Sequence, residues 1–176
     1  FSQTQGFRHG SISDGHSAIS KLAASHSIEV DSTESSDVFT DEGLAKYDAV
    51  MFLNTTGDVL NEQQQIAFQR YIQGGGGYIG VHSASDTEYG WPWYGQLVGA
   101  YFVDHPAIQE ARLVVDDSRH PSTAHLDDEW VRSDEWYNHR FVNDNLNVLL
   151  SIDKQSYDAG TDTFEGATQP MSWYHS

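Results

Sequence analysis

Two unbroken apolar runs dominate the pattern of the first half of the chain. Residues 49–53 and 78–81 carry no charged side chain, which is typical of short strands covered on both faces. Between them, a capping-box pattern at residues 61–64 predicts the start of a helix, and the glycines at 74–77 end it. This strand–helix–strand order predicts parallel strands joined by a crossover helix.

The segment before residue 49 shows the same rhythm with weaker signals. A helix is expected over residues 12–23, capped by Ser11 or Ser13, because its apolar positions recur at helical spacing. A short strand is predicted at residues 28–30, and Thr40 caps a further short helix. The predicted apolar face of the first helix consists of Ile12, Ile19, Leu22 and Ala23.

The second half of the chain is less regular. An aromatic segment begins at residue 91, and strands are predicted at 109–115, 147–152 and 170–175. The Gly-, Thr- and Asp-rich stretch 155–169 is predicted to be an exposed loop. No repeat or linker is evident, so we expect one α/β domain over residues 1–176. Its sheet should be mostly parallel, with helices on both faces.

The amino-acid composition limits which kinds of binding partner are expected. The 176 residues carry 26 Asp+Glu against nine Lys+Arg, a formal charge of −17, which disfavours nucleic acid and anionic membrane surfaces. No apolar run is long enough to cross a bilayer, so membrane insertion is not expected. No signal peptide is visible, which leaves cytoplasmic and secreted or periplasmic locations both open. The absence of cysteine excludes disulfides, thiolate metal ligands and cysteine nucleophiles.

Polar side chains follow both strands of the predicted parallel pair. Asn54, Thr55 and Thr56 come directly after the first strand, and His82 and Asp86 after the second. The carboxyl ends of parallel strands share one edge of a sheet, where α/β proteins bind ligands. These five residues are therefore predicted to line one crevice.

Histidine is abundant, with nine residues in this short chain. His9, His82 and His175 each follow a predicted strand, so we expect them to approach one another above one sheet edge. Most single histidines have structural or solvated roles, and placement at a strand end is what favours function here. The remaining candidates for a polar cluster with aromatic walls are Glu135, His105, Trp93 and Tyr137.

His82 stands where many α/β enzymes present a nucleophile on a sharp strand-to-helix turn. Ser83 is one position late and no G-x-S-x-G motif is present, which disfavours a serine hydrolase. An imidazole suits general acid/base work near neutral pH, or ligation of a divalent metal such as zinc. No H-x-H or H-E-x-x-H spacing supports a metal, so the cofactor is left open.

Taken together, these stretches resemble the ThuA-like (trehalose-utilisation) family. The matching pieces lie in the expected order across the chain: FRHGSI from residue 7, FLNTTGDVL from 52, GGGYIGVH from 75, DTEY from 86, WPWY from 91, DEWY from 134 and WYH from 173.

The resemblance implies a flavodoxin-like three-layer sandwich similar to class I glutamine amidotransferases. In those enzymes the turn residue is a cysteine, and a histidine follows a later strand. His82 and His175 have the corresponding placements here, and the missing thiol excludes glutamine hydrolysis through a thioester. The resemblance also leads us to expect that this sequence omits the start of the family's first strand, which Phe1 would end, and its C-terminal strand and helix.

Three functional hypotheses remain open on this basis. The leading one is an enzyme acting on a disaccharide or a derived keto-sugar, with His82, Glu135, His9 and His175 as its chemical groups. Asn54, Thr55, Thr56, Asp86, Trp93, His105 and Tyr137 would then bind the sugar. The alternatives are a non-catalytic carbohydrate-binding domain and a metal-dependent hydrolase of another small molecule. Homo-oligomerisation is compatible with each hypothesis.

Overall fold

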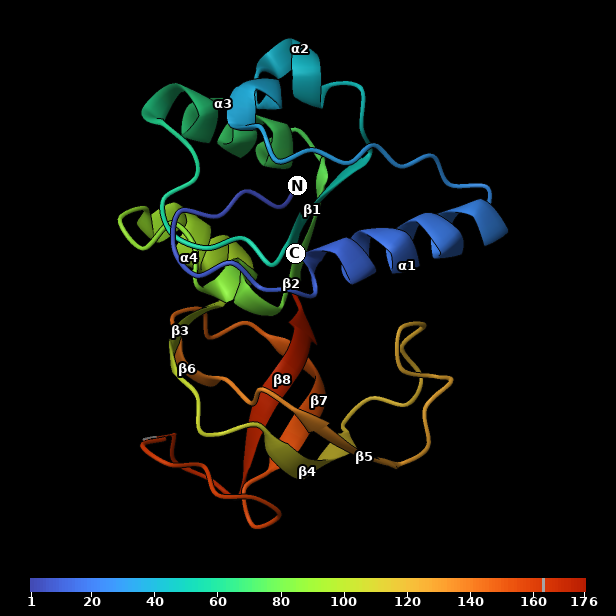
Figure 1. Cartoon of the computed structure of the whole chain (residues 1–176), viewed down its shortest axis with the longest axis vertical. Coiled ribbons are helices and arrows are strands. Elements are labelled where there is room, and N and C mark those ends of the chain that lie inside the picture. The colour runs from blue at the N-terminus through green and yellow to red at the C-terminus, as the bar shows by residue number, and fades with distance from the viewer. Residues whose placement is uncertain (163) are drawn as a thin grey trace. The chain divides into compact units, whose positions relative to one another are not determined.

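The computed structural model describes residues 1–162 and 164–176 and has a mixed α/β fold. The chain divides into two compact units, Phe1–Val98 and Gly99–Ser176 (Figure 1). Within the described residues, no helix is both long and apolar enough to cross a membrane.

The first unit confirms the predicted parallel pair. Strand β1 (Ala49–Leu53) lies beside β2 (Gly77–Val81), in register from Ala49 opposite Gly77 to Leu53 opposite Val81. Helix α3 (Glu62–Gln73) is the crossover between them (Figure 1). The remaining elements are α1 (Ile12–Ser25), the 3₁₀ turn η1 (Ser36–Val38), α2 (Asp41–Leu44), the 3₁₀ turn η2 (His82–Ser85) and α4 (Pro92–Val98).

Two of the predicted helix starts are confirmed at the level of hydrogen bonds. The Thr40 side chain accepts a bond from the Gly43 N–H at the start of α2. At the start of α3, the Asn61 side chain accepts from the N–H groups of Gln63 and Gln64. The Gln64 side chain accepts in return from the Asn61 N–H, completing the capping box.

An aromatic cluster fills the core of the first unit. Phe52 on β1 is fully buried, and its ring stacks on Phe68 of α3 with centroids 5.4 Å apart. Phe39 and Phe1 meet the Phe52 ring edge-on. The Phe1 backbone also bonds β1, since Leu53 N–H donates to the Phe1 carbonyl oxygen, so the chain start lies along this strand.

Two local predictions in the first unit are wrong. Residues 28–30 form no strand, and Ile28 and Val30 are exposed, because this segment has no neighbouring strand that bonds its backbone. On α1, Ile12 and Ala23 are buried as predicted, whereas Leu22 is 62% exposed. Helical spacing placed Leu22 correctly on the helix, but it lies beyond the edge of the buried stripe.

The second unit is built from strands. A two-stranded antiparallel pair joins β3 (Ala100–Asp104) to β6 (Asn138–Phe141). A four-stranded sheet has the order β5-β4-β7-β8 and is antiparallel throughout. Its strands are β4 (Gln109–Val115), β5 (Glu129–Asp134), β7 (Asn147–Asp153) and β8 (Thr168–Tyr174).

The prediction of a mostly parallel sheet is therefore not confirmed. Among the named strands of the described residues, β1 and β2 pair in parallel, and the other pairs are antiparallel. Parallel strands need a long crossover, usually a helix, and after Val98 the described residues contain no helix. The three predicted strands of this half exist but pair antiparallel, as loop-connected strands do. The three-layer arrangement implied by the resemblance stays a prediction.

The stretch predicted as a loop, 155–169, is largely irregular and includes residue 163, which lies outside the described residues. Its last residues belong to β8, which begins at Thr168. The loop is anchored by the ammonium of Lys154, whose Nζ lies 2.6 Å from the carboxylate of Asp162. The Lys154 ammonium also donates to the carbonyl of Phe164.

A buried carboxylate ties together the loops that follow β1 and β2. Glu88 is 1% exposed, and its Oε1 accepts bonds of 2.7 Å from the N–H groups of Val59 and Leu60. Its Oε2 accepts a third bond of 2.7 Å, from Gln65 Nε2 on α3. Burial raises the pKa of Glu88 above its ordinary value, and the three donors oppose that shift.

We expect Glu88→Ala to lower the free energy of unfolding by about 3 kcal/mol, because it leaves two buried N–H groups without an acceptor. Glu88→Gln keeps an acceptor oxygen and should cost about 1 kcal/mol. Urea denaturation of both variants measures the difference. Equal losses in the two variants would contradict this role.

The same variants carry a pH test. Because the pKa of Glu88 is raised in the folded state, the folded protein takes up this proton at a higher pH than the unfolded chain does. As the pH falls from neutral toward 4.5, the free energy of unfolding of the wild type should therefore rise relative to that of Glu88→Gln.

Candidate functional site

The loop after β1 begins with a residue in left-handed conformation. Asn54 has φ 52°, and its N–H donates to the Val81 carbonyl at the end of β2, at 3.2 Å. Its side-chain Nδ2 donates to Ser11 Oγ, at 3.0 Å, beside the start of α1. Asn54 therefore connects β1, β2 and α1 at the predicted sheet edge.

Thr55 and Thr56, predicted as sugar-binding groups, are fully buried. Thr55 Oγ1 lies 2.9 Å from Thr87 Oγ1, and Thr56 Oγ1 donates to the Phe7 carbonyl at 2.9 Å. Both hydroxyls thus hold protein segments together in this structure. A contact of either with a sugar stays a prediction.

His82 stands at the carboxyl end of β2, on the turn η2. Its φ is 53°, a region that favours glycine, and its side chain is exposed in the first unit. The β2 strand brings the chain to the sheet edge, and the left-handed residue turns it sharply into η2. A strained residue at such a position is typical of functional sites.

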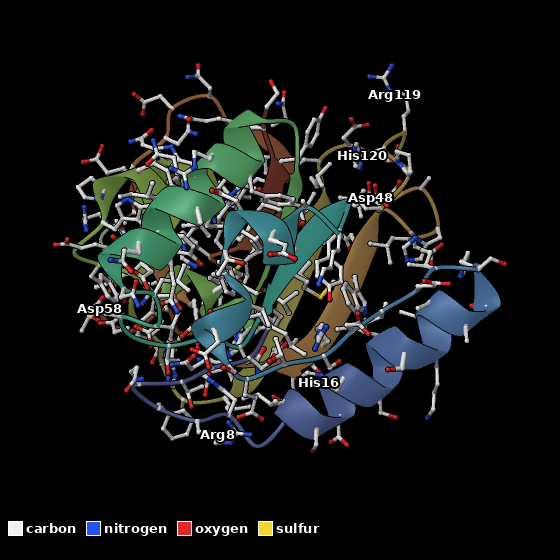
Figure 2. The ribbon with its side chains drawn as sticks, turned by 90° about the horizontal axis from the view of Figure 1, so that it is seen from above. Arg8, His16, Asp48, Asp58, Arg119 and His120 are labelled. Atoms are coloured by element: carbon white, nitrogen blue, oxygen red, sulfur yellow. The ribbon has the colours of Figure 1, made fainter. Side chains whose placement is uncertain are left out.

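The N-terminal segment brings His9 to the same place. Gln5 N–H donates to the Thr56 carbonyl at 2.8 Å, and the Thr56 hydroxyl holds the Phe7 carbonyl. Arg8 (Figure 2) donates from both terminal nitrogens to the carboxylate of Glu34, each at 2.8 Å. The chain that leads into His9 is thereby fixed on the side that precedes the imidazole.

The structure brings His9 and His82 together, as the sequence predicted for two of its three histidines. Their Nε2 atoms lie 3.2 Å apart, and the rings meet edge to face with centroids 4.7 Å apart. His9 Nδ1 lies 3.4 Å from Ser83 Oγ. Two imidazole lone pairs repel at this distance, so a shared proton or a cation between the Nε2 atoms stabilises the arrangement.

The spacing also fits two ligands of one metal ion. Bonds of roughly 2.0–2.1 Å at a tetrahedral angle place two nitrogen ligands roughly 3.3 Å apart, close to the observed separation. His9 and His82 are thus the residues of the first unit that could hold zinc or a similar ion. Ser83 would then orient the His9 ring from its other nitrogen.

The acidic residues near His82 in sequence have other partners. Asp86 accepts a 2.7 Å bond from the Tyr89 hydroxyl, and Glu88 is directed inward to the amides described above. His16 (Figure 2) lies on α1, where its Nε2 is 2.9 Å from Ser2 Oγ. The close partner of the His82 imidazole in this unit is therefore another imidazole.

In the second unit, three of the predicted site residues come together. His105 Nε2 lies 3.6 Å from a carboxylate oxygen of Glu135, and the His105 ring stacks on Tyr137 with centroids 5.8 Å apart. Phe102 packs against the same tyrosine at 4.3 Å. Tyr137 is buried, while His105 and Glu135 are partly accessible.

Two other predicted residues are placed by different elements of their own units. His175 follows β8 in the second unit. Trp93 lies on α4 in the first unit, where its ring stacks on Trp91 at 4.9 Å and meets Phe68 edge-on. The convergence of Glu135 and His175 with His9 and His82 stays a prediction, as does a sugar contact for Trp93.

Two surface hollows lie away from the histidine pair. One, of about 380 Å³ in the second unit, includes the ion pair between Arg112 and Asp153 in its lining. The other, of about 370 Å³ in the first unit, includes the ion pair between Arg70 and Asp41. In both, the one arginine of the lining is already paired with a carboxylate, and one further carboxylate remains, Glu110 in the second unit and Asp37 in the first. Neither hollow contains a histidine, so the imidazole chemistry of the candidate site lies elsewhere.

Sequence reasoning missed the hydroxyl groups around His82. Thr87 Oγ1 donates to the Ser83 carbonyl, and Tyr94 Oη to the Ala84 carbonyl. Thr87 lies in the same motif as His82 and could have been noticed from that proximity. Tyr94 has no local signal, because its approach to the turn depends on how α4 packs.

Comparison with known proteins relates the whole chain to one protein family. The family model described as "ThuA: Trehalose utilisation" matches residues 1–176. A putative ThuA-like protein from Bacteroides uniformis ATCC 8492 is 25% identical, with a TM-score of 0.80, over 98% of this chain and 74% of that one. A putative ThuA-like protein from Parabacteroides merdae ATCC 43184 shares the fold at 17% identity and a TM-score of 0.73, over 98% and 72% of the two chains. No curated protein matches the chain.

The conformation at His82 gives a direct stability test. We expect the free energy of unfolding of His82→Gly to exceed that of His82→Ala by about 1 kcal/mol, since an alanine Cβ is strained at φ 53° and glycine is not. Because both variants lose the imidazole, the difference between them in chemical denaturation measures the backbone strain alone. Greater stability of the alanine variant would show that the turn is unstrained.

Proposed function

Since the chain belongs to the ThuA trehalose-utilisation family, we propose that it acts on a disaccharide, or on a keto-sugar derived from one, with His9 and His82 as its reaction centre. The observation that carries this proposal is the close pair of imidazoles at a strand end, presented by a left-handed residue. Family membership supplies the substrate class, and the pair supplies the chemistry.

The pair is suited to moving one proton. When one Nε2 carries hydrogen, it donates to the lone pair of the other, and the second ring stabilises the charge that develops on the first. The exposed His82 ring can give that proton to a glycosidic oxygen or take one from a carbon next to a keto group. Glycosidic cleavage, β-elimination and isomerisation each require such a step.

We assign sugar recognition to the polar and aromatic residues predicted from the sequence. Asp86 in the first unit and His105 in the second are the more accessible of these and offer hydrogen bonds. Asn54, Thr55, Thr56 and Tyr137 are retained as weaker candidates because they are buried, and Trp93 because its ring packs against Phe68. Glu135 and His175 are proposed as further chemical groups. The formal charge of −17 suits a neutral sugar better than an anionic one.

The principal alternative is a carbohydrate-binding domain without catalysis. It would use the same polar and aromatic groups, but it gives no reason for two imidazoles to face each other. Separate measurement of sugar binding and sugar turnover distinguishes the two functions.

We expect His82→Gln to lower the turnover rate of the disaccharide or keto-sugar that serves as substrate by about a hundredfold to ten-thousandfold, because a general acid/base is lost. Sugar affinity, measured by calorimetry, should change little. Trehalose and its keto derivative are the first substrates to assay.

His26→Gln is the matched control, because His26 is an exposed histidine at the end of α1 that bonds Ser25 and the Leu22 carbonyl. It should leave turnover unchanged. Turnover by His82→Gln at the wild-type rate would remove His82 from the mechanism, and sugar binding without any turnover in the wild type would favour the alternative.

If the reaction is metal-assisted, zinc should bind the wild-type protein at a site that needs both imidazoles. We expect His9→Gln and His82→Gln each to weaken zinc affinity at least about tenfold, and His26→Gln to leave it unchanged. Calorimetric titration with zinc measures this, and elemental analysis of active protein complements it. Full activity in metal-free protein would assign the pair to proton transfer alone.

A further inference from the structure

Three successive carbonyl groups of the turn η2 each accept a bond from a different side-chain hydroxyl. Ser85 Oγ donates to the His82 carbonyl at 3.3 Å, and Thr87 Oγ1 to the Ser83 carbonyl at 3.1 Å. Tyr94 Oη donates to the Ala84 carbonyl at 2.8 Å. We propose that these three hydroxyls, termed the hydroxyl brace, are positioning groups that hold His82 in its left-handed conformation facing His9.

The turn needs such support because its first residue is strained. A non-glycine residue in the left-handed region costs roughly 1–2 kcal/mol, and His82 carries this cost even though histidine is found there more often than most residues. Without fixed partners for its carbonyls, the turn could relax to an ordinary conformation. The imidazole of His82 would then leave the position 3.2 Å from His9.

Tyr94 anchors the brace in the core. Its side chain is 0% exposed, and its ring lies against Phe52 with centroids 5.6 Å apart. The single hydroxyl proton of Tyr94 goes to the Ala84 carbonyl, so the neighbouring Tyr78 hydroxyl, at 2.8 Å, donates to Tyr94. Burial raises the pKa of Tyr94 well above its usual value, which keeps the hydroxyl a donor.

Thr87 connects the brace to the loop after β1. It is fully buried, and its proton goes to the Ser83 carbonyl, so the Thr55 hydroxyl at 2.9 Å donates to Thr87. Thr55 lies directly after β1. Through Thr87, the turn that carries His82 is therefore fixed to the neighbouring strand as well as to the core.

The three bonds of the brace go to backbone carbonyls of the turn. Ser83 lies between the brace and the imidazole pair, since its carbonyl accepts from Thr87 and its Oγ lies 3.4 Å from His9 Nδ1. The role of the brace in a reaction rests on the proposed function. Its role in placing His82 rests on geometry and is tested without a substrate.

The test compares Thr87→Val and Tyr94→Phe, which remove hydroxyls bonded to the turn, with Tyr78→Phe, which removes a buried hydroxyl bonded only to the brace. In the full chain with labelled histidine, the nuclear Overhauser effect between the ring protons of His9 and His82 reports their approach. Urea denaturation of each variant reports overall stability. We expect the effect to be lost in Thr87→Val and Tyr94→Phe and kept in Tyr78→Phe, although all three lose stability.

Thr87→Ser keeps a hydroxyl at this position and should keep the contact between the His9 and His82 rings. If Thr87→Val or Tyr94→Phe fails to fold, the same measurement is made on Ser85→Ala, which removes the hydroxyl bonded to the His82 carbonyl. An unchanged ring contact in the folded brace variants, or its equal loss in Tyr78→Phe, would overturn the proposal. A protein that keeps the ring contact but turns over no sugar would refute the proposed function and leave the brace intact.

Discussion

Gly57 is the point at which the loops after β1 and β2 become one structure. Its N–H donates to the Asp86 carbonyl at 2.8 Å, and its carbonyl accepts from the Glu88 N–H at 3.2 Å. Its φ of 74° and the Gln5 side chain, which lies 3.0 Å from where a Cβ would be, leave room for glycine alone. Through this exchange of backbone bonds, the loop bearing Asn54 and the turn bearing His82 hold a fixed relation.

Three of the four left-handed non-glycine residues of the first unit lie around that junction, the fourth being Ser27 after α1. Asn54, His82 and Glu88 all have φ between 52° and 55°, and all follow the carboxyl ends of the parallel strands. Each is held by hydrogen bonds: Asn54 bonds the Val81 carbonyl and Ser11, the Glu88 carboxylate accepts from three donors, and the His82 carbonyl accepts from Ser85. Local strain that surrounding contacts maintain is a mark of a site selected for its geometry.

The mixed α/β character could be predicted from the sequence, and so could much of the first unit, but the mostly parallel sheet is not confirmed. Residues 49–53 and 77–81 form strands because they are continuous apolar runs, and the capping box at Asn61 begins α3 because it satisfies its own backbone donors. The pairing of the second half could not be predicted in the same way. Strand patterns at 109–115 and 147–152 carry no information on direction, which is decided by the partner strand.

For the candidate site, the sequence by itself determined the chemistry: no thiol, an imidazole at the turn after β2, and a second imidazole at position 9. It also determined that β1 and β2 deliver their loops to the same edge, because a crossover helix permits only that arrangement. The tertiary structure decided the 3.2 Å approach of the two rings and the inward direction of Glu88. It also brought the Tyr94 hydroxyl to the turn. Those outcomes depend on φ values and on packing between segments far apart in the chain, and neither is encoded in local pattern.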